Sequence, residues 1–300
     1  MKDVKVVIRK KTTKTVKLKA GLKEEFKKSP ICTNYQCVFQ FGGDSLGADI
    51  VMFNIDSLQH YQTPPVRDPG ALWVFQTTEP PWLNITTSSA WDGVFNYSVI
   101  YKADTFGSRY SFRDTIKRKP IPETYDFAAL NGKRWANALW FTSHCGQNHK
   151  VPVTSARETY ATELAKYIHI DVFTKTEDCM QLLRPLVRND MYKVEPKMKE
   201  YTFYLAFENS LCEDYITEKL WKVLEDDESY TIPVVLGGLS IDEYRKVAPP
   251  NSFIHVKNFT SIKALADHLK FVAGSAKAFN YYMQWRNEYT LENKGTFTGT

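Results

Sequence analysis

The sequence predicts an α/β protein made of two Rossmann-like domains that face each other across a cleft, and two observations carry this prediction. The stretch 201–238 contains an apolar strand, a polar loop, an amphipathic helix and a second apolar strand, in that order. Apolar runs bounded by polar residues are typical of a parallel sheet covered on both faces. Apolar segments also occur on both sides of a polar, proline-bearing stretch at 113–131. Strands that alternate with helices indicate parallel sheets, here in two halves.

The other elements follow from the same reasoning. Short apolar runs predict strands, with a turn between the first two, at 37–41, 48–55, 71–76, 94–101, 136–143 and 170–173. A helix is expected over 155–168 with Ser155 as its N-cap, because Leu164 and Ile168 share one face with two tyrosines. We therefore expect a basic segment of unclear structure at 1–30, an N-terminal domain at 31–130 and a C-terminal domain at 131–300.

Composition places the chain among ordinary globular proteins. Its 300 residues are 43% hydrophobic and 24% charged, which is enough for a sizeable core. Residues 1–30 hold eleven Lys and Arg and three acids, a net of +8; because the whole chain carries +5, the remainder carries −3. A solvated basic tail is the simplest interpretation. Nucleic-acid binding would rest on this tail alone, and the tail lacks interleaved aromatic residues.

Compartment signals in the sequence are few. No run of about eighteen apolar residues is present, and the first twenty residues lack the apolar core of a signal peptide. The five cysteines leave at least one unpaired within the chain and fit no zinc pattern, so no metal site is expected. Sequons at Asn84, Asn96 and Asn258 are weak indications of the secretory pathway.

The helix that follows Asp214 is the candidate ligand site. A loop at the carboxyl end of a parallel strand that opens into a helix is where α/β proteins bind phosphates. In the first turns, Lys219 would add a full charge to the unpaired backbone N–H groups, and Glu218 would accept hydrogen bonds from sugar hydroxyls. Tyr204 and Tyr215 would offer a stacking face or a hydroxyl. The alternative is a solvated Glu–Lys pair on an amphipathic helix.

Several stretches resemble the α1,3-fucosyltransferase family, whose members use GDP-fucose. The matching stretches read YTFYLAFENS at 201–210, DYITEKLW at 214–221, PVVLG at 233–237 and NSFIHV at 251–256. The resemblance extends over 36–286 and implies the glycosyltransferase architecture called GT-B, in which 31–130 would be the acceptor-side domain and 131–300 the GDP-fucose-binding domain. It also implies donor contacts from Tyr204, Asn209, Tyr215, Glu218 and Lys219.

Looser matches extend the implied site. Arg157, before the pattern YATEL, corresponds to a family arginine on the donor diphosphate. Ser143 and His144 stand where the family has Ser-Asn near the nucleotide, with His144 a departure. Tyr110 matches a donor-side tyrosine at a spacing one residue short. Glu79, in the loop Glu-Pro-Pro, corresponds to the family's catalytic base, although the family has a serine after it.

The resemblance implies an inverting transfer of L-fucose from GDP-β-L-fucose to the 3-hydroxyl of an N-acetylglucosamine in a glycoprotein or glycolipid glycan. Glu79 would act as the base, and no cofactor would be required, a divalent metal being at most stimulatory. The resemblance implies action in the Golgi lumen from a membrane anchor, and no such anchor is expected within these 300 residues. The alternatives are a catalytically impaired, truncated relative that binds GDP-sugars and another GT-B nucleotide-sugar transferase.

Overall fold

The structure is a computed structural model of the chain, and it divides into two compact units. One comprises Met1–Ser111 with Lys294–Thr300, and the other Phe112–Asn293; they are called unit 1 and unit 2 below. The residues that the structure describes are 4–9, 37–41, 46–54, 58, 63–77, 79–80, 89–102, 116–118, 135–143, 145, 155–174, 176–183, 187–188, 198–226 and 230–291.

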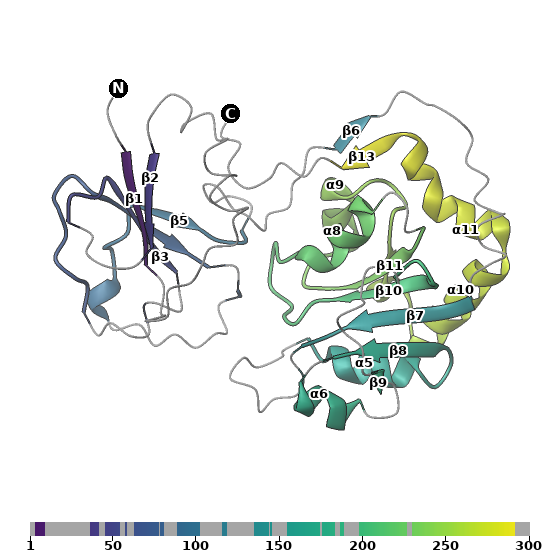
Figure 1. Cartoon of the computed structure of the whole chain (residues 1–300). Coiled ribbons are helices and arrows are strands. Elements are labelled where there is room, and N and C mark those ends of the chain that lie inside the picture. Colours follow the sequence, from purple (N-terminus) through teal and green to yellow (C-terminus); the bar gives the residue numbers. More distant parts are fainter. Residues whose placement is uncertain are drawn as a thin grey trace. The chain divides into compact units, whose positions relative to one another are not determined.

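Unit 1 is built on a parallel sheet of five strands (Figure 1). The strands are β1 (Val4–Arg9), β2 (Cys37–Phe41), β3 (Ile50–Asn54), β4 (Leu72–Gln76) and β5 (Tyr97–Val99), in the sheet order β2-β1-β3-β4-β5. The interpretation of the whole of 1–30 as a solvated tail is therefore wrong, because β1 lies between β2 and β3. Its sequence VKVVIR is rich in β-branched residues, which favour strands.

An aromatic cluster forms the described core of unit 1. Phe53 contacts Trp73 at a ring-centroid distance of 4.8 Å and Trp91 at 5.6 Å. Trp91 belongs to the 3-10 helix η1 (Ser89–Trp91). The guanidinium of Arg67 lies over the Trp73 ring at 5.2 Å and donates to the carbonyl oxygen of Val94 at 2.9 Å. Arg67 thereby ties the segment before β4 to the segment before β5.

Unit 2 has the strand order of a complete Rossmann fold (Figure 1). Its parallel sheet contains β7 (Trp135–Phe141), β8 (His169–Phe173), β9 (Val187–Arg188), β10 (Tyr201–Phe207), β11 (Ile232–Leu236) and β12 (Ile254–His255), in the order β12-β11-β10-β7-β8-β9. A separate antiparallel pair joins β6 (Ile116–Arg118) to β13 (Tyr289–Leu291). This pair places 116–118 with unit 2, so the units divide earlier in the chain than the expected boundary at 130/131.

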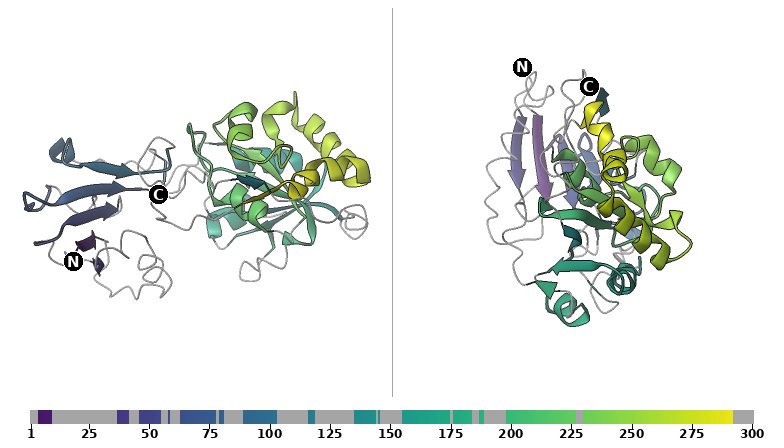
Figure 2. Two further views of the ribbon diagram at one scale, coloured as in Figure 1. Left: turned by 90° about the horizontal axis from the view of Figure 1, so that it is seen from above. Right: turned by 90° about the vertical axis from the view of Figure 1, so that its right-hand side faces the viewer.

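Helices cover both faces of the unit 2 sheet (Figure 2). One face packs against α5 (Arg157–Leu164), α6 (Glu177–Leu182), α10 (Ile262–Gly274) and α11 (Ala276–Met283). The other packs against α8 (Glu218–Glu225), α9 (Ile241–Val247) and the 3-10 helix η5 (Gln284–Asn287). Side chains alternate along the strands, so Phe203 and Leu205 face the first layer and Tyr204 faces the second. Every residue of β10 and β11 is buried, as the sequence predicts for strands covered on both faces.

The predicted α/β class with parallel sheets is confirmed. Two local predictions need correction. Ser155 does not cap α5, because Ala156 takes that position in a left-handed conformation with φ 51°. The helix expected directly after Asp214 begins at Glu218 instead. Within the described residues, no helix is both long and apolar enough to cross a bilayer.

Candidate active site

The strand order of unit 2 predicts where a ligand binds. The chain leaves β7 toward β8 on one side and leaves β10 toward β11 on the other, so β7 and β10 flank a topological switch point. In open α/β sheets, ligands bind outside the carboxyl ends of the strands at such a point. These ends are Phe141 and Phe207. The predicted site residues Ser143 and Asn209 each lie two residues beyond these ends, and Ser143 is half-buried.

Arg157 reaches this point from α5. Its side chain is 3% exposed, and its Nη1 donates to the carbonyl oxygen of Phe207 at 3.2 Å. The Nε atom lies 3.6 Å from Glu158 Oε1, and the guanidinium lies 5.8 Å from the centroid of the Trp140 ring. Burial lowers the pKa of Arg157, and the nearby carboxylates of Glu158 and Glu208 act against that shift. A guanidinium stays charged in proteins, so the switch point holds a permanent buried cation.

A second cation is held at the start of α8. Glu208, the residue after β10, has a side chain only 1% exposed. Its Oε1 accepts from the Thr217 backbone N–H at 2.8 Å, and its Oε2 accepts from the Thr217 hydroxyl at 2.8 Å and from Lys219 Nζ at 3.0 Å. The carboxylate thus caps α8 and pairs with Lys219. Part of the helix terminus expected to bind phosphate is therefore already occupied by a protein anion.

The Lys219 ammonium also contacts Thr217, which is buried, and Glu218, which is exposed. Its Nζ donates to Thr217 Oγ1 at 2.6 Å and to Glu218 Oε1 at 3.3 Å. The Lys219 side chain is 16% exposed and that of Glu218 is 59% exposed. Burial alone would lower the pKa of Lys219, but the carboxylates of Glu208 and Glu218 raise that pKa above its ordinary value. The ammonium is therefore charged at neutral pH.

Three further residues that were predicted to contact the donor, Tyr204, Tyr215 and Asn209, are buried. Tyr204 packs its ring against Phe141 at 5.7 Å, and burial raises the pKa of its hydroxyl. Tyr215 is 3% exposed. Asn209 is 7% exposed, and its Oδ1 has no hydrogen-bond partner among the described residues; the same holds for Ser210 Oγ. Buried polar atoms normally have partners, so these two are available to a polar ligand or to water.

Two glycines let the neighbouring loops pack at this edge. A Cβ atom at Gly237 would lie 2.4 Å from Tyr244 Oη, and one at Gly238 would lie 2.2 Å from the carbonyl oxygen of Cys212. No real Cβ tolerates such contacts. The loop between β10 and α8 therefore lies directly on the end of β11, and Asp214 turns that loop with φ 58°.

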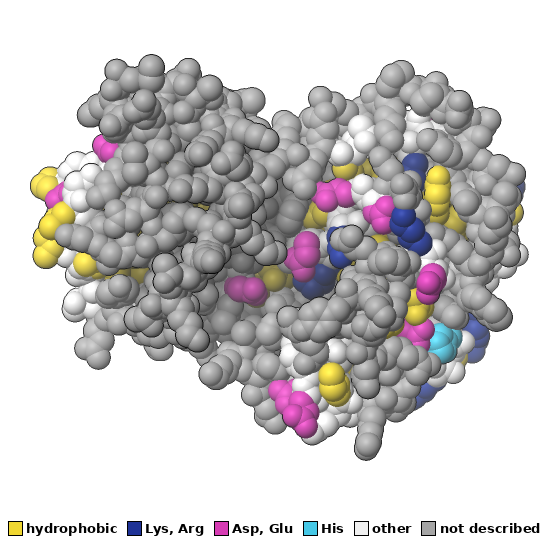
Figure 3. All heavy atoms as spheres, viewed as in Figure 1, with side chains coloured by type: hydrophobic (Ala, Val, Ile, Leu, Met, Phe, Trp, Pro, Cys, Tyr) yellow, Lys and Arg dark blue, Asp and Glu magenta, His cyan; other side chains and the backbone are white. Residues whose placement is uncertain are grey.

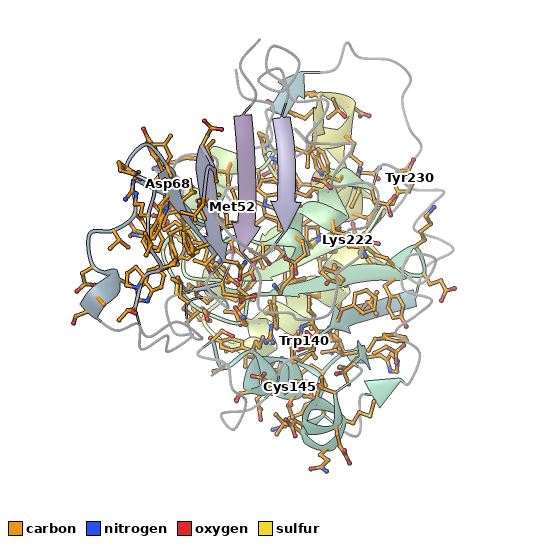
Figure 4. The ribbon with its side chains drawn as sticks, turned by 60° about the vertical axis from the view of Figure 1, so that its left-hand side comes forward. Met52, Asp68, Trp140, Cys145, Lys222 and Tyr230 are labelled. Atoms are coloured by element: carbon orange, nitrogen blue, oxygen red, sulfur yellow. A yellow bond between two sulfur atoms is a disulfide. The ribbon has the colours of Figure 1, made fainter. Side chains whose placement is uncertain are left out.

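A disulfide fixes the other side of the switch point. Cys145, which comes shortly after β7, is bonded to Cys179 in α6. Trp140 and Cys145, both labelled in Figure 4, belong to the apolar cluster beneath α5. The bond ties Cys145, near the carboxyl end of β7, to α6.

The remaining predicted residues are distributed as follows. Glu79 lies in unit 1, half-buried in the turn that follows β4, and its backbone N–H donates to Thr77 Oγ1 at 3.1 Å. Asn96 and Asn258 are exposed, and Asn96 Oδ1 also accepts from the Trp73 backbone N–H at 2.8 Å. Three predicted residues lie outside the described residues: Tyr110, His144 and Asn84.

Sequence reasoning assigned no role to Glu208, Thr217 or Glu158. The available signal for Glu208 was an acid placed directly after a wholly apolar strand. The available signal for Thr217 was a hydroxyl residue just before a helix, the usual N-cap position. Glu158 gave no signal beyond its position beside Arg157.

Charges of both signs occur side by side at the surface of unit 2 in the view of Figure 3. In the described part of the chain, no group of three or more His, Cys, Asp or Glu side chains is arranged to hold a metal ion.

Several known proteins are similar to this chain. Alpha-(1,3)-fucosyltransferase C of Drosophila melanogaster is 29% identical over 89% of this chain and 64% of that protein. Alpha-(1,3)-fucosyltransferase fut-1 of Caenorhabditis elegans is 30% identical over 87% and 56%. Human 4-galactosyl-N-acetylglucosaminide 3-alpha-L-fucosyltransferase FUT5 is 32% identical over 74% and 54%. The chain thus spans roughly half to two thirds of the length of these relatives.

Solved structures of alpha1,3-fucosyltransferase share the fold. One with GDP-fucose has a TM-score of 0.56 at 16% identity, covering 98% of this chain and 87% of that one. One with GDP has a TM-score of 0.57 at 19% identity, covering 99% and 86%. The expected GT-B class is confirmed by these likenesses. The model of the glycosyltransferase family 10 (fucosyltransferase) C-terminal domain matches residues 131–298. The chain therefore belongs to glycosyltransferase family 10, the fucosyltransferases.

Proposed function

We propose that this protein transfers L-fucose from GDP-β-L-fucose to the 3-hydroxyl of an N-acetylglucosamine in a glycoprotein or glycolipid glycan, with inversion at the fucose carbon. The observation that carries the proposal is the pair of cations, Arg157 and Lys219, at the switch point of a unit that matches the fucosyltransferase family. A nucleoside diphosphate is the ligand that two cations beside a helix terminus suit best.

Residues of unit 2 would hold the donor. Arg157 and Lys219 would neutralise the diphosphate, with Arg157 able to form a bidentate contact. The exposed carboxylate of Glu218 would accept hydrogen bonds from sugar hydroxyls. Asn209, whose Oδ1 has no partner among the described residues, would contribute a further polar contact. These roles match those that the family resemblance implies.

The transfer itself is a single displacement. The oxygen of the acceptor 3-hydroxyl forms a bond to the fucose anomeric carbon while the bond from that carbon to the phosphate oxygen breaks. GDP leaves with the electron pair, and its charge is neutralised by the two cations. Glu79 accepts the proton of the hydroxyl, and general-base help of this kind is worth about 10²–10⁴ in rate. The transition state resembles an oxocarbenium ion, as in glycoside hydrolysis.

Donor binding is proposed to need no divalent metal, because two side-chain cations supply the charge that a metal would otherwise provide. The proposed place of action is the Golgi lumen. The disulfide between Cys145 and Cys179 supports an oxidising compartment, and the exposed Asn96 and Asn258 are compatible with glycosylation there. The acceptor class is supported by relatives whose names specify galactosyl-N-acetylglucosaminides.

The test has a binding part and a transfer part. Titration calorimetry with GDP, UDP and ADP, in buffer containing EDTA, is expected to give clear binding for GDP alone. Fucose transfer is then measured to N-acetyllactosamine and to a glycan with a chitobiose core. Preference for UDP would indicate another nucleotide-sugar transferase, and GDP binding without transfer would indicate a catalytically impaired relative. Loss of GDP binding in EDTA would overturn the proposal of metal independence.

A further inference from the structure

Glu208 is a buried carboxylate to which the proposed function assigns no role. Its side chain is 1% exposed, and it contacts the Thr217 N–H, the Thr217 hydroxyl and Lys219 Nζ at 2.8–3.0 Å. Burying a charge is costly unless the charge is paired and hydrogen-bonded. Removal of either Glu208 or Lys219 would leave the other charge buried without its partner, which is strongly destabilising. The two groups therefore hold each other in position.

The position of Glu208 is itself fixed. Its backbone N–H donates to the carbonyl oxygen of Leu236 at 2.9 Å, which ties it to the end of β11. A Cβ added at Gly237 would lie 3.7 Å from Glu208 Cγ and only 2.4 Å from Tyr244 Oη, so the wall behind Glu208 is tightly packed. The carboxylate is therefore a fixed point at the edge of the sheet.

The three contacts of the Lys219 ammonium differ in character. An ammonium has three N–H donors, and here they meet Glu208, Thr217 and Glu218. The first two partners are buried, whereas the Glu218 side chain is 59% exposed. The two inner contacts hold the ammonium against the protein, and the outward contact to Glu218 is the one that a ligand oxygen would replace.

We propose that Glu208 is a positioning residue that holds the Lys219 ammonium, together with the first turn of α8, in place for the donor diphosphate. This inference rests on the proposed function, in which Lys219 binds that diphosphate. A cation held before the ligand arrives loses little conformational freedom on binding, and this preorganisation strengthens the complex.

Glu208 also keeps Lys219 charged. Burial lowers the pKa of Lys219, and the nearby Arg157 lowers it as well, whereas Glu208 and Glu218 raise it. Without the Glu208 charge, only Glu218 opposes burial and Arg157, so the pKa of Lys219 falls. GDP affinity in a Glu208→Gln variant should therefore drop more at high pH than at low pH. A merely structural role for Glu208 would not produce this pH dependence.

The experiment is titration calorimetry of the full chain with GDP at pH 6.5 and pH 8.5. The variants are Glu208→Gln, Lys219→Met, the double variant, and Glu163→Gln as a control. Glu163 pairs with Lys166 at the surface, with side chains 41% and 59% exposed, so its substitution should leave affinity unchanged. Glu208→Gln is expected to weaken GDP binding about tenfold or more at pH 8.5, as for loss of a charged hydrogen bond, and less at pH 6.5. In the Lys219→Met background, the same change should alter affinity by less than about twofold.

Each alternative outcome is decisive. If folded Glu208→Gln binds GDP like the wild type at both pH values, or if the two substitutions add, Glu208 does not act through Lys219. If Glu208→Gln does not fold, the double variant still decides, because it carries no unpaired buried charge. It should unfold at a higher temperature than either single variant and bind GDP like Lys219→Met; a lower unfolding temperature, or a further loss of affinity, overturns the inference. Failure of the wild type to bind GDP would instead contradict the proposed function.

Discussion

The carboxyl edge of the unit 2 sheet and the Glu79 turn of unit 1 hold their polar side chains in different ways. In unit 2, Arg157 and Lys219 are largely buried, and each contacts several partners. In unit 1, Glu79 is half-buried, and its turn is closed by a bond from its backbone N–H to Thr77 Oγ1. Substitutions at the unit 2 edge should therefore disturb folding and ligand binding together, whereas the role proposed for the Glu79 carboxylate is proton transfer.

The largest expected effect comes from Glu79→Gln. The amide keeps the shape of the side chain but cannot accept the acceptor's proton. Fucose transfer should fall by about 10²–10⁴, the usual worth of a general base, with GDP affinity and melting temperature unchanged. A radiochemical transfer assay, calorimetry and thermal unfolding measure the three quantities. Near-full transfer by the folded variant would show that another group is the base.

Gly238→Ala tests how tightly the unit 2 edge is packed. Its Cβ would lie 2.2 Å from the carbonyl oxygen of Cys212, so the loop between β10 and α8 must move. Overpacking of this kind costs about 1–3 kcal/mol or more. Gly274→Ala is the matched control, because nothing lies within 4 Å of its added Cβ. Denaturant unfolding of both variants gives the comparison, and equal stability of the two would contradict the close packing described here.

A matched pair of threonines compares the two regions directly. Thr217→Val removes the hydroxyl that contacts both Glu208 and Lys219, and we expect a loss of about 1–3 kcal/mol with weaker GDP binding. Thr77→Val removes the hydroxyl that accepts from the Glu79 N–H. We expect a loss of about 0.5–1.5 kcal/mol, with GDP affinity unchanged. Denaturant unfolding measures the stability of both variants, and calorimetry measures their GDP affinity. If GDP affinity fell equally in the two variants, the two regions would not differ in the way proposed.

The smallest effect concerns pH and His255, at the end of β12. Its Nε2 hydrogen-bonds the carbonyl oxygen of Leu239 and its Nδ1 accepts from the Lys257 N–H, both at 3.1 Å, which favours the neutral ring. Burial lowers the pKa of His255 below 6.5. The unfolded chain then binds more protons than the folded chain at acidic pH. Stability should therefore be retained above about pH 6.5 and lost as pH falls further, by up to about 1.4 kcal/mol per pH unit.

His255→Asn should flatten this acid-side decline relative to the wild type when unfolding free energies are measured between pH 7.5 and 5. His169→Asn is the control, because His169 is half exposed, with a side chain 50% accessible. An equally steep decline in His255→Asn and the wild type would show that His255 does not titrate in this way.

Strands could be predicted from the sequence where both faces of the strand are buried. Every residue of β10 and β11 is buried, so their apolar runs are unmistakable in the sequence. β1 was not predicted, because Lys5 and Arg9 make it part of a basic run. Its β-branched residues were the local signal for a strand, and that strand forms by pairing with β2 and β3. The helix α8 begins at Glu218 rather than directly after Asp214, because the preceding residues place the Thr217 backbone N–H where it donates to the Glu208 carboxylate.

The candidate site could be predicted to the extent that its residues lie in recognisable motifs. Arg157, Asn209 and Lys219 are brought to the carboxyl edge of one sheet, as the strand–loop–helix pattern and the family resemblance imply. Glu208 was missed because an acid after a strand is ordinarily solvated. Only the fold shows that Thr217 and Lys219 enclose it.

The most direct test is calorimetric titration of GDP onto three forms of the 300-residue chain: the wild type, Glu79→Gln and Arg157→Met. Donor binding is proposed to involve residues of unit 2, so the wild type and Glu79→Gln should bind GDP equally. Arg157→Met should lose at least about tenfold in affinity, since a charged hydrogen bond to phosphate is removed. Wild-type affinity in folded Arg157→Met, or loss of binding in Glu79→Gln, would contradict this proposal.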